Sequence, residues 1–185
     1  MKLDRERIIG AAFALLDEEG IEGLSLRKLA ARLGVQAPAI YWYIPNKAGL
    51  LRLMSAQLTA CARQDCAGAS DWRTWLIAFG RAVRTAFLAH RDSAKLYADA
   101  GSIPENPGEI GDQIAAPLVA LGLSREDAIS YQGSVISLSL GWALFEQTPP
   151  MRDFLSGMMD MEESFEKGLT AMVRGFSPGS APPAA

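Results

Sequence analysis

Residues that hold metals or form cross-links are scarce in this chain of 185 residues. Histidine occurs once, at His90, and the two cysteines, Cys61 and Cys66, lie five positions apart with no histidine near them. This spacing fits neither a zinc site nor a disulfide framework. The sequence therefore predicts no metal site, no cofactor, and two reduced, partly buried thiols.

Long apolar runs are also missing. The longest uncharged stretch, residues 128–145, contains four serines, a tyrosine and a glutamine, and it falls short of the about 20 consecutive apolar residues that cross a bilayer. Residues 1–7 are charged and lack the apolar segment of a secretory signal. We therefore expect a cytoplasmic protein without membrane contact.

Catalytic motifs are absent as well. No nucleophile elbow, phosphate-binding loop or metal-spaced cluster accompanies His90. This histidine is interpreted as a structural residue at a helix junction, and enzymatic activity is not expected.

Charge is distributed unevenly along the chain, whose formal net charge is −3. Residues 1–67 hold nine basic and seven acidic side chains, whereas residues 68–185 hold nine basic and fourteen acidic ones. Residues 25–52 contain no acidic side chain and five basic ones, namely Arg27, Lys28, Arg32, Lys47 and Arg52. This window is predicted to contact phosphates, and the two parts of the chain to face different partners.

Apolar residues recur with helical spacing through most of the chain, and no alternating strand pattern of useful length occurs, so the predicted fold class is all-α. Gly20 is expected to end the first helix, and Pro149 and Pro150 the helix at 125–147. Residues 99–108 are predicted as a loop, and residues 177–185, rich in proline, alanine and serine, as a disordered tail. The predicted helices cover residues 3–19, 26–33, 37–43, 47–67, 72–87, 90–98, 110–121, 125–147 and 160–174.

Two short helices with a glycine-containing turn between them, preceded and followed by longer helices, are typical of a three-helix helix-turn-helix domain. Ser25 is a suitable N-cap for residues 26–33, Gly34 suits a left-handed C-terminal position, and Pro38 is tolerated in the first turn of the next helix. We predict a DNA-binding domain at residues 1–46, with residues 37–43 as the recognition helix, and an effector-binding and dimerisation domain at residues 47–176.

The side chains that the small helical core leaves free have the chemistry of a DNA surface. Arginine bonds guanine, glutamine bonds adenine, and small apolar groups approach the thymine methyl. Tyrosine hydroxyls and lysine suit phosphates, and phosphate contacts position the protein on DNA without reading the base sequence. The bland alternative is a solvated basic face with some rings in the core. The predicted DNA-contacting residues are Arg27, Lys28, Gln36, Ala37, Pro38, Ala39, Tyr41, Trp42, Tyr43 and Lys47.

The run LSLRKLAARLGVQAPAIYWYIPNKAGLL at residues 24–51 resembles the DNA-binding domain of the TetR (tetracycline repressor) family. The similarity extends to HRDSAKLY at residues 90–97 and, more weakly, to SLSLGW at 137–142 and FEKGL at 165–169. The resemblance implies that the bases are contacted by Arg27, Gln36, Pro38 and Ala39. It implies that the DNA backbone is contacted by Tyr41, Tyr43 and Lys47.

Three residues differ from the tetracycline repressors within this motif. Ala37 and Ala39 stand where those proteins carry hydrogen-bonding side chains, and Tyr43 stands where they carry histidine. Each lost polar contact changes base discrimination by about 1–3 kcal/mol, so an operator other than the tet operator is expected.

The resemblance also implies a ligand pocket among helices four to eight and dimerisation through the helices at 125–147 and 160–174. In the tetracycline repressors an imidazole at the position of Tyr97 binds drug-chelated magnesium, and polar side chains at the positions of Arg63 and Phe79 hold the drug. Gln113 matches a drug-contacting position, but magnesium-tetracycline is not expected here. We predict a hydrophobic or aromatic effector, with a lining formed by Phe79, Val83, Tyr97, Gln113, Trp142 and Phe145.

The aromatic residues and the methionines of this part of the chain each allow a second interpretation. Aromatic residues at helical spacing are also what a plain core contains. Met158, Met159 and Met161 either line an adaptable site or fill the dimer interface.

These features together predict a ligand-responsive repressor that binds a palindromic double-stranded DNA operator as a homodimer, with two recognition helices about one helical turn apart. The family mechanism implies that the ligand makes the sixth helix displace the fourth and thereby releases DNA. The alternatives are a small-molecule-sequestering module with weak DNA binding, and an activator that uses the same DNA-binding domain.

Overall fold

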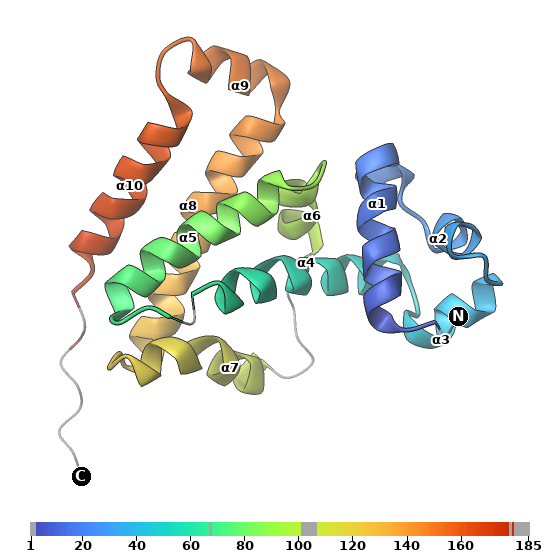
Figure 1. The fold of residues 1–185 in the computed structure, drawn as a ribbon, viewed down its shortest axis with the longest axis horizontal. Coiled ribbons are helices and arrows are strands. Elements are labelled where there is room, and N and C mark those ends of the chain that lie inside the picture. The colour runs from blue at the N-terminus through green and yellow to red at the C-terminus, as the bar shows by residue number, and fades with distance from the viewer. Residues whose placement is uncertain (1–2, 67, 101–106, 178, 180–185) are drawn as a thin grey trace.

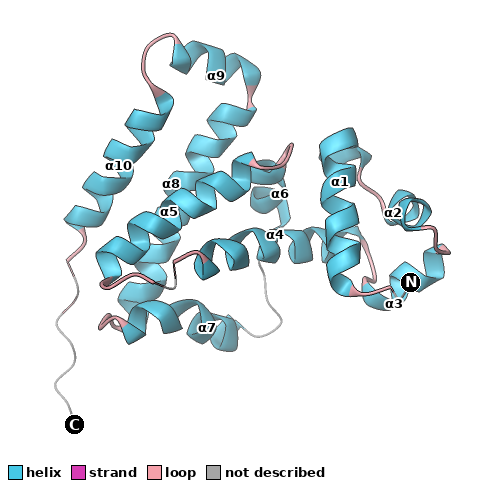
Figure 2. Cartoon of the chain, in the orientation of Figure 1, coloured by secondary structure: helices cyan, strands magenta, loops and turns pink. Residues whose placement is uncertain are grey.

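A computed structural model describes residues 3–66, 68–100, 107–177 and 179. These residues form ten helices and no strand (Figure 2), which confirms the predicted all-α class. In chain order the helices are α1 (Arg5–Gly23), α2 (Leu26–Leu33), α3 (Ala37–Tyr43), α4 (Lys47–Gln64), α5 (Trp72–Leu88), α6 (Ser93–Ala100), α7 (Pro107–Ala120), α8 (Arg125–Gln147), α9 (Pro149–Ser156) and α10 (Met161–Gly175).

Helices α1 to α3 lie together at one end of the molecule (Figure 1). The Ser25 hydroxyl accepts a hydrogen bond from the Lys28 amide at 3.3 Å, which begins α2, and Gly34 ends it with φ 67°. Pro38 lies in the first turn of α3. The predicted bounds of α2 and α3 are therefore confirmed; those of α2 follow from capping by Ser25 and Gly34, and the start of α3 from the proline in its first turn.

Helix α1 continues beyond its predicted end. Gly20 leaves helical geometry at φ 72°, but helical residues resume and extend to Gly23. The Ile21 amide donates to Asp92 Oδ2 at 3.0 Å, so a side chain 71 positions away replaces the hydrogen bond that the kink removes. The predicted end at Gly20 is therefore confirmed for the regular helix, whereas the short helical segment at residues 21–23, which depends on a tertiary partner, was not predicted.

Helix α4 runs from the N-terminal helices into the rest of the molecule (Figure 1). Its first turn is capped by Asn46, whose Oδ1 accepts from the Gly49 amide at 2.8 Å. The helix ends at Gln64, three residues before the predicted end, and Ala67 lies outside the described residues. Because α4 packs against α1, α5 and α6, it contacts both the N-terminal helices and the C-terminal part of the chain.

The C-terminal helices differ from the predictions at three points. Pro149 and Pro150 do end α8, but they also occupy the first positions of α9, where proline needs no intrahelical N–H partner, and α9 was not predicted. Helix α6 begins at Ser93 rather than at His90, and α7 begins at Pro107 inside the predicted loop. Residues 101–106 of that loop, and residues 178 and 180–185 of the predicted tail, lie outside the described residues.

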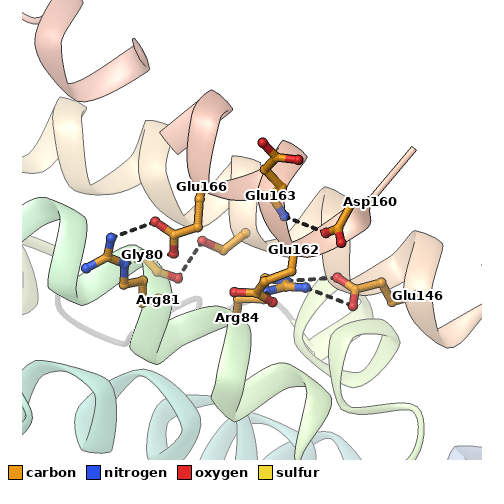
Figure 3. A network of polar contacts seen from close by, with 9 residues as sticks. Gly80, Arg81, Arg84, Glu146, Asp160, Glu162, Glu163 and Glu166 are labelled. Carbon is orange, nitrogen blue, oxygen red and sulfur yellow. Dashed lines mark hydrogen bonds and ion pairs between the residues drawn. The ribbon is translucent and has the colours of Figure 1, made fainter. Parts of the chain in front are cut away.

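Arginines on α5 attach the C-terminal helix to the rest of the domain (Figure 3). Arg84 donates to both Glu146 carboxylate oxygens of α8, at 2.8 and 3.0 Å, and pairs with Glu162 of α10. One turn away, Arg81 forms a two-pronged pair with Glu166 at 2.8 and 2.6 Å. These contacts fix α10 against α5 and α8. No helix in the described part of the chain has the length and apolar composition to cross a membrane.

Candidate nucleic-acid interface and effector cavity

Helix α3 exposes almost its whole length. Ile40 is its one buried residue and packs into the core, while Pro38 and Ala39 face solvent and Ala37 is half-buried. Exposed residues also include Gln36, just before α3, and Arg27 and Lys28 on α2. The structure therefore places the ten residues predicted to contact DNA on α2, on α3 with the turn before it, and on the first residue of α4.

Aromatic side chains crowd the C-terminal half of α3. Trp42 is 83% exposed, Tyr41 46% and Tyr43 39%. The rings of Trp42 and Tyr43 meet edge to face with centroids 5.2 Å apart. Large rings left in water are costly, and clusters of them mark surfaces that bind a partner. The outer face of α3 has this character and a basic border.

Three of the predicted DNA-contacting side chains also have partners within the protein. Lys47 Nζ donates to the Ile21 carbonyl at 2.9 Å, Tyr43 donates through its hydroxyl to the Leu3 carbonyl at 3.0 Å, and Lys28 pairs with Glu19. Arg27, in contrast, has no hydrogen bond or ion pair to any described residue. Lys47 and Tyr43 therefore hold the N-terminal helices in place, and Arg27 is the cation with its donors unused.

A cavity of about 540 Å³ lies among α4, α6, α7 and α8. Four isoleucines give its wall an apolar part, and four longer polar side chains lie among them. Its lining consists of Ala56, Thr59, Ala60, Arg63, Tyr97, Ile110, Gln113, Ile114, Ile129, Gln132, Gly133 and Ile136.

Only two of the six predicted lining residues, Tyr97 and Gln113, line this cavity. Phe79 and Val83 are fully buried in the α5 core, where Phe79 stacks on Trp75 with ring centroids 4.8 Å apart. Trp142 meets Phe165 of α10 edge on, and Phe145 is 43% exposed near the end of α8. Trp142 and Phe145 lie away from the cavity because α8 turns another face toward it, and Phe79 and Val83 because α5 does not contribute to its lining.

The α8 residues that do line the cavity were missed by the sequence analysis. Ile129, Gln132, Gly133 and Ile136 follow helical spacing, and this spacing was the available signal. It does not distinguish a cavity wall from an ordinary buried face, since both are apolar stripes.

Two titratable groups in the cavity respond to burial. Burial lowers the pKa of Arg63 from its ordinary value, and burial raises the pKa of Tyr97, an effect that the nearby Arg63 charge opposes. Arg63 Nε lies 3.5 Å from Gln132 Oε1, and its guanidinium lies 5.6 Å from the centre of the Phe79 ring. At neutral pH the cavity thus contains a cation and a protonated phenol.

The cavity does not fit a chelated magnesium ion. Its lining has no histidine or carboxylate, and the described residues contain no group of three histidine, cysteine or acidic side chains arranged to hold a metal. His90 lies elsewhere, stacked on Phe13 with ring centroids 4.4 Å apart and 2.9 Å from Asp17 through Nδ1. Its position agrees with the structural interpretation.

The cavity and the N-terminal helices are joined through α6. Tyr97 of α6 lines the cavity, whereas Asp92, just before α6, accepts the Ile21 amide hydrogen bond of α1. Lys95 of α6 pairs with Glu22 of α1 at 3.2 Å. The Ile21 backbone is therefore held on both sides, by Asp92 at its amide and by Lys47 of α4 at its carbonyl.

Comparison with known proteins covers both halves of the chain. Residues 8–54 match the family model described as "Bacterial regulatory proteins, tetR family", and residues 66–157 match "Tetracyclin repressor-like, C-terminal domain". The tetracycline repressor protein class A from transposon 1721 of Escherichia coli is 35% identical, over 95% of this chain and 91% of that protein.

Solved structures agree with the sequence matches. A TetR variant from Acinetobacter baumannii AYE in complex with minocycline superimposes with a TM-score of 0.76 at 33% identity, covering 95% of this chain and 97% of that one. BioQ with its natural double-stranded DNA operator gives a TM-score of 0.62 at 31% identity, covering 92% and 99% of the two chains. The relatives are named as regulators or repressors, which are not enzymes. From both halves of its sequence and from its fold, the chain belongs to the TetR family of bacterial transcriptional regulators.

Proposed function

We propose that this protein is a ligand-responsive repressor that binds a palindromic double-stranded DNA operator as a homodimer. Residues 1–46 form the DNA-binding domain, and residues 47–176 bind the effector and dimerise. The observation that supports this most strongly is the outer face of α3, where Trp42 and its aromatic neighbours are exposed beside the unpaired Arg27. A helix of this kind fits the major groove.

In this proposal the side chains of α2 and α3 divide the work of recognition. Arg27 and Gln36 hydrogen-bond to base edges, and Ala37, Pro38 and Ala39 approach thymine methyl groups. Phosphate contacts come from Lys28, Tyr41, Trp42, Tyr43 and Lys47, and they set the position of the domain on DNA.

The dimer forms through α8 and α10, which pack against each other and against α5. A two-fold axis along this pair of helices gives each dimer two α3 helices, and a palindromic operator with half-sites about one helical turn apart matches that symmetry.

The effector in this proposal is a hydrophobic or aromatic small molecule, other than magnesium-tetracycline, that occupies the cavity. Because α4 and α6 both line the cavity, a ligand there displaces α6 against α4. Lys47 of α4 and Asp92, just before α6, both bond to the Ile21 backbone of α1, so this displacement moves α3 and lowers operator affinity.

Selection from a random-sequence duplex library tests DNA binding directly. The wild-type protein should enrich a two-fold-symmetric motif. Arg27→Ala combined with Tyr41→Ala should bind that motif at least about tenfold more weakly, since a base-contacting arginine contributes about 1–3 kcal/mol. Arg152→Ala, on α9 far from α3 along the chain, is the control and should bind like the wild type. Recovery of no symmetric motif would overturn the proposal and favour the sequestering module.

A promoter-reporter assay separates repressor from activator. With the selected motif placed over a promoter, the protein should reduce transcription, and an increase would identify an activator with the same DNA-binding domain.

A further inference from the structure

We propose that the effector carries one negatively charged group that pairs with Arg63, while its apolar body lies against the isoleucine wall of the cavity. The inference rests on the proposed function and specifies its ligand class as an organic anion with a hydrophobic or aromatic body. It starts from the charge balance inside the cavity.

Arg63 is a half-buried cation without a counter-ion among the described residues. Its side chain lines the cavity, and its hydrogen-bond partner is the uncharged Gln132 amide, with Nε 3.5 Å from Oε1. Arginine keeps its proton under all ordinary conditions. Removing a charge from water without a partner is costly, so a position that served stability alone would favour an apolar side chain.

Arg84 in the same domain shows how this protein balances a buried arginine by itself. Its guanidinium is held by Glu146 at 2.8 and 3.0 Å and also by Glu162 (Figure 3). Arg84 is surrounded by two carboxylates, whereas the side chain of Arg63 borders the open cavity. No carboxylate among the described residues takes that place, so we assign the role of partner to an anionic ligand.

The other polar groups of the cavity strengthen this preference for an acceptor. Gln132 uses its amide nitrogen on the carbonyls of Ile114 and Ala128, at 2.7 and 3.3 Å, which leaves its oxygen directed to Arg63. Tyr97 keeps its proton, because burial raises the pKa of this phenol, and so offers a hydrogen-bond donor. A ligand that fits these donors has to present oxygen acceptors.

The remaining wall determines the rest of the molecule. Ile110 and Ile114 of α7 and Ile129 and Ile136 of α8 give an apolar surface in a cavity of about 540 Å³. This volume suits a drug-sized molecule. The favoured occupant is an amphiphile with an anionic end at α4 and an apolar end between α7 and α8.

Two fluorescent dyes that differ in one charged group test the inference on the full-length protein. The first is 1-anilinonaphthalene-8-sulfonate, and the second is N-phenyl-1-naphthylamine, which has the same rings without the sulfonate. Arg63→Gln should weaken binding of the sulfonate dye by about 10- to 100-fold, the range for a charge-assisted pair in a cavity. Binding of the uncharged dye should change by less than about threefold, since its apolar contacts remain.

Controls separate this result from loss of folding. Arg52→Gln removes an exposed arginine from the same helix and should bind both dyes like the wild type, and Arg63→Lys should keep part of the preference for the sulfonate. Thermal unfolding by circular dichroism checks that each variant is folded. Competition extends the test to carboxylates, because 1-naphthoate should displace the sulfonate dye and 1-naphthamide should not.

Two outcomes would overturn the inference. One is equal binding of the sulfonate dye by wild type and Arg63→Gln, and the other is an equal loss of both dyes in a folded Arg63→Gln variant. Either result leaves the proposed repressor intact if the wild type still selects a symmetric operator. If the wild type selects no symmetric operator but Arg63→Gln specifically weakens binding of the sulfonate dye, the proposed repressor is rejected and the proposed ligand class is kept.

Discussion

Gly20 lies in the left-handed region where α1 kinks, and the space beside it is filled. A Cβ added there would lie 2.7 Å from Asp92 Oδ2 and 3.3 Å from the Arg91 guanidinium. We expect Gly20→Ala to lower the free energy of unfolding by about 1–3 kcal/mol, because a left-handed backbone and a displaced Asp92 both cost energy. Urea denaturation measures this.

Gly10, on the same helix, supplies the matched control. No atom lies within 4 Å of a Cβ added there, so Gly10→Ala should stabilise the protein by about 0.5–1 kcal/mol through helix propensity. Equal effects of the two substitutions would contradict the role assigned to the kink.

The two cysteines differ in reactivity for a physical reason. Cys61 is exposed, whereas Cys66 is buried, and burial raises the pKa of its thiol to about 11. At pH 8 the Cys66 thiolate is therefore rare, and iodoacetamide should label one cysteine in the native protein and two after unfolding. Mass spectrometry counts the labels, and Cys61→Ser should leave the native protein unlabelled. Labelling of native Cys61→Ser would show that Cys66 is accessible.

At the level of elements, α5 is joined to α8 and to α10 by ion pairs of different burial. The Arg84 and Glu146 side chains are mostly buried, but the Arg81 side chain is largely exposed. Arg84→Met leaves Glu146 without its partner and should cost about 3 kcal/mol, since breaking a buried pair strands a charge. Arg81→Met should cost less than about 1 kcal/mol, as solvent screens this pair. Thermal unfolding compares the two, and a larger loss for Arg81→Met would contradict this assignment.

Elements defined by local chemistry were predictable from the sequence. Ser25, Gly34 and Pro38 set α2 and α3 through capping and proline geometry, and the exposed face of α3 followed from those bounds. The helical segment after Gly20 was not predictable, because it depends on a carboxylate 71 residues away. The cavity lining was missed for a related reason, since the face that α8 turns toward the cavity depends on its packing against both α5 and α7.

Across the whole molecule, Lys47 at the start of α4 and Asp92 just before α6 both bond to the Ile21 backbone, so the N-terminal helices are tied at one residue to two helices that line the cavity. Asp92→Asn keeps an oxygen acceptor but removes its charge, which should weaken this hydrogen bond by about 1 kcal/mol. Amide exchange at Ile21 should then become faster while exchange in the α5 core stays unchanged. Hydrogen-exchange mass spectrometry measures both, and unchanged exchange at Ile21 would show that the junction does not depend on Asp92.

The exposed indole of Trp42 has an optical consequence for the whole protein. The chain has four tryptophans, and Trp42 is far more exposed than Trp72, Trp75 or Trp142, so light absorbed by the other three is emitted from less polar surroundings. The long-wavelength edge of the native emission spectrum therefore reports on one ring near the C-terminal end of α3. Docking of α3 in a groove should quench that edge, and Trp42→Phe should remove it. Trp42 is thus an intrinsic fluorophore on the surface where DNA is expected to bind.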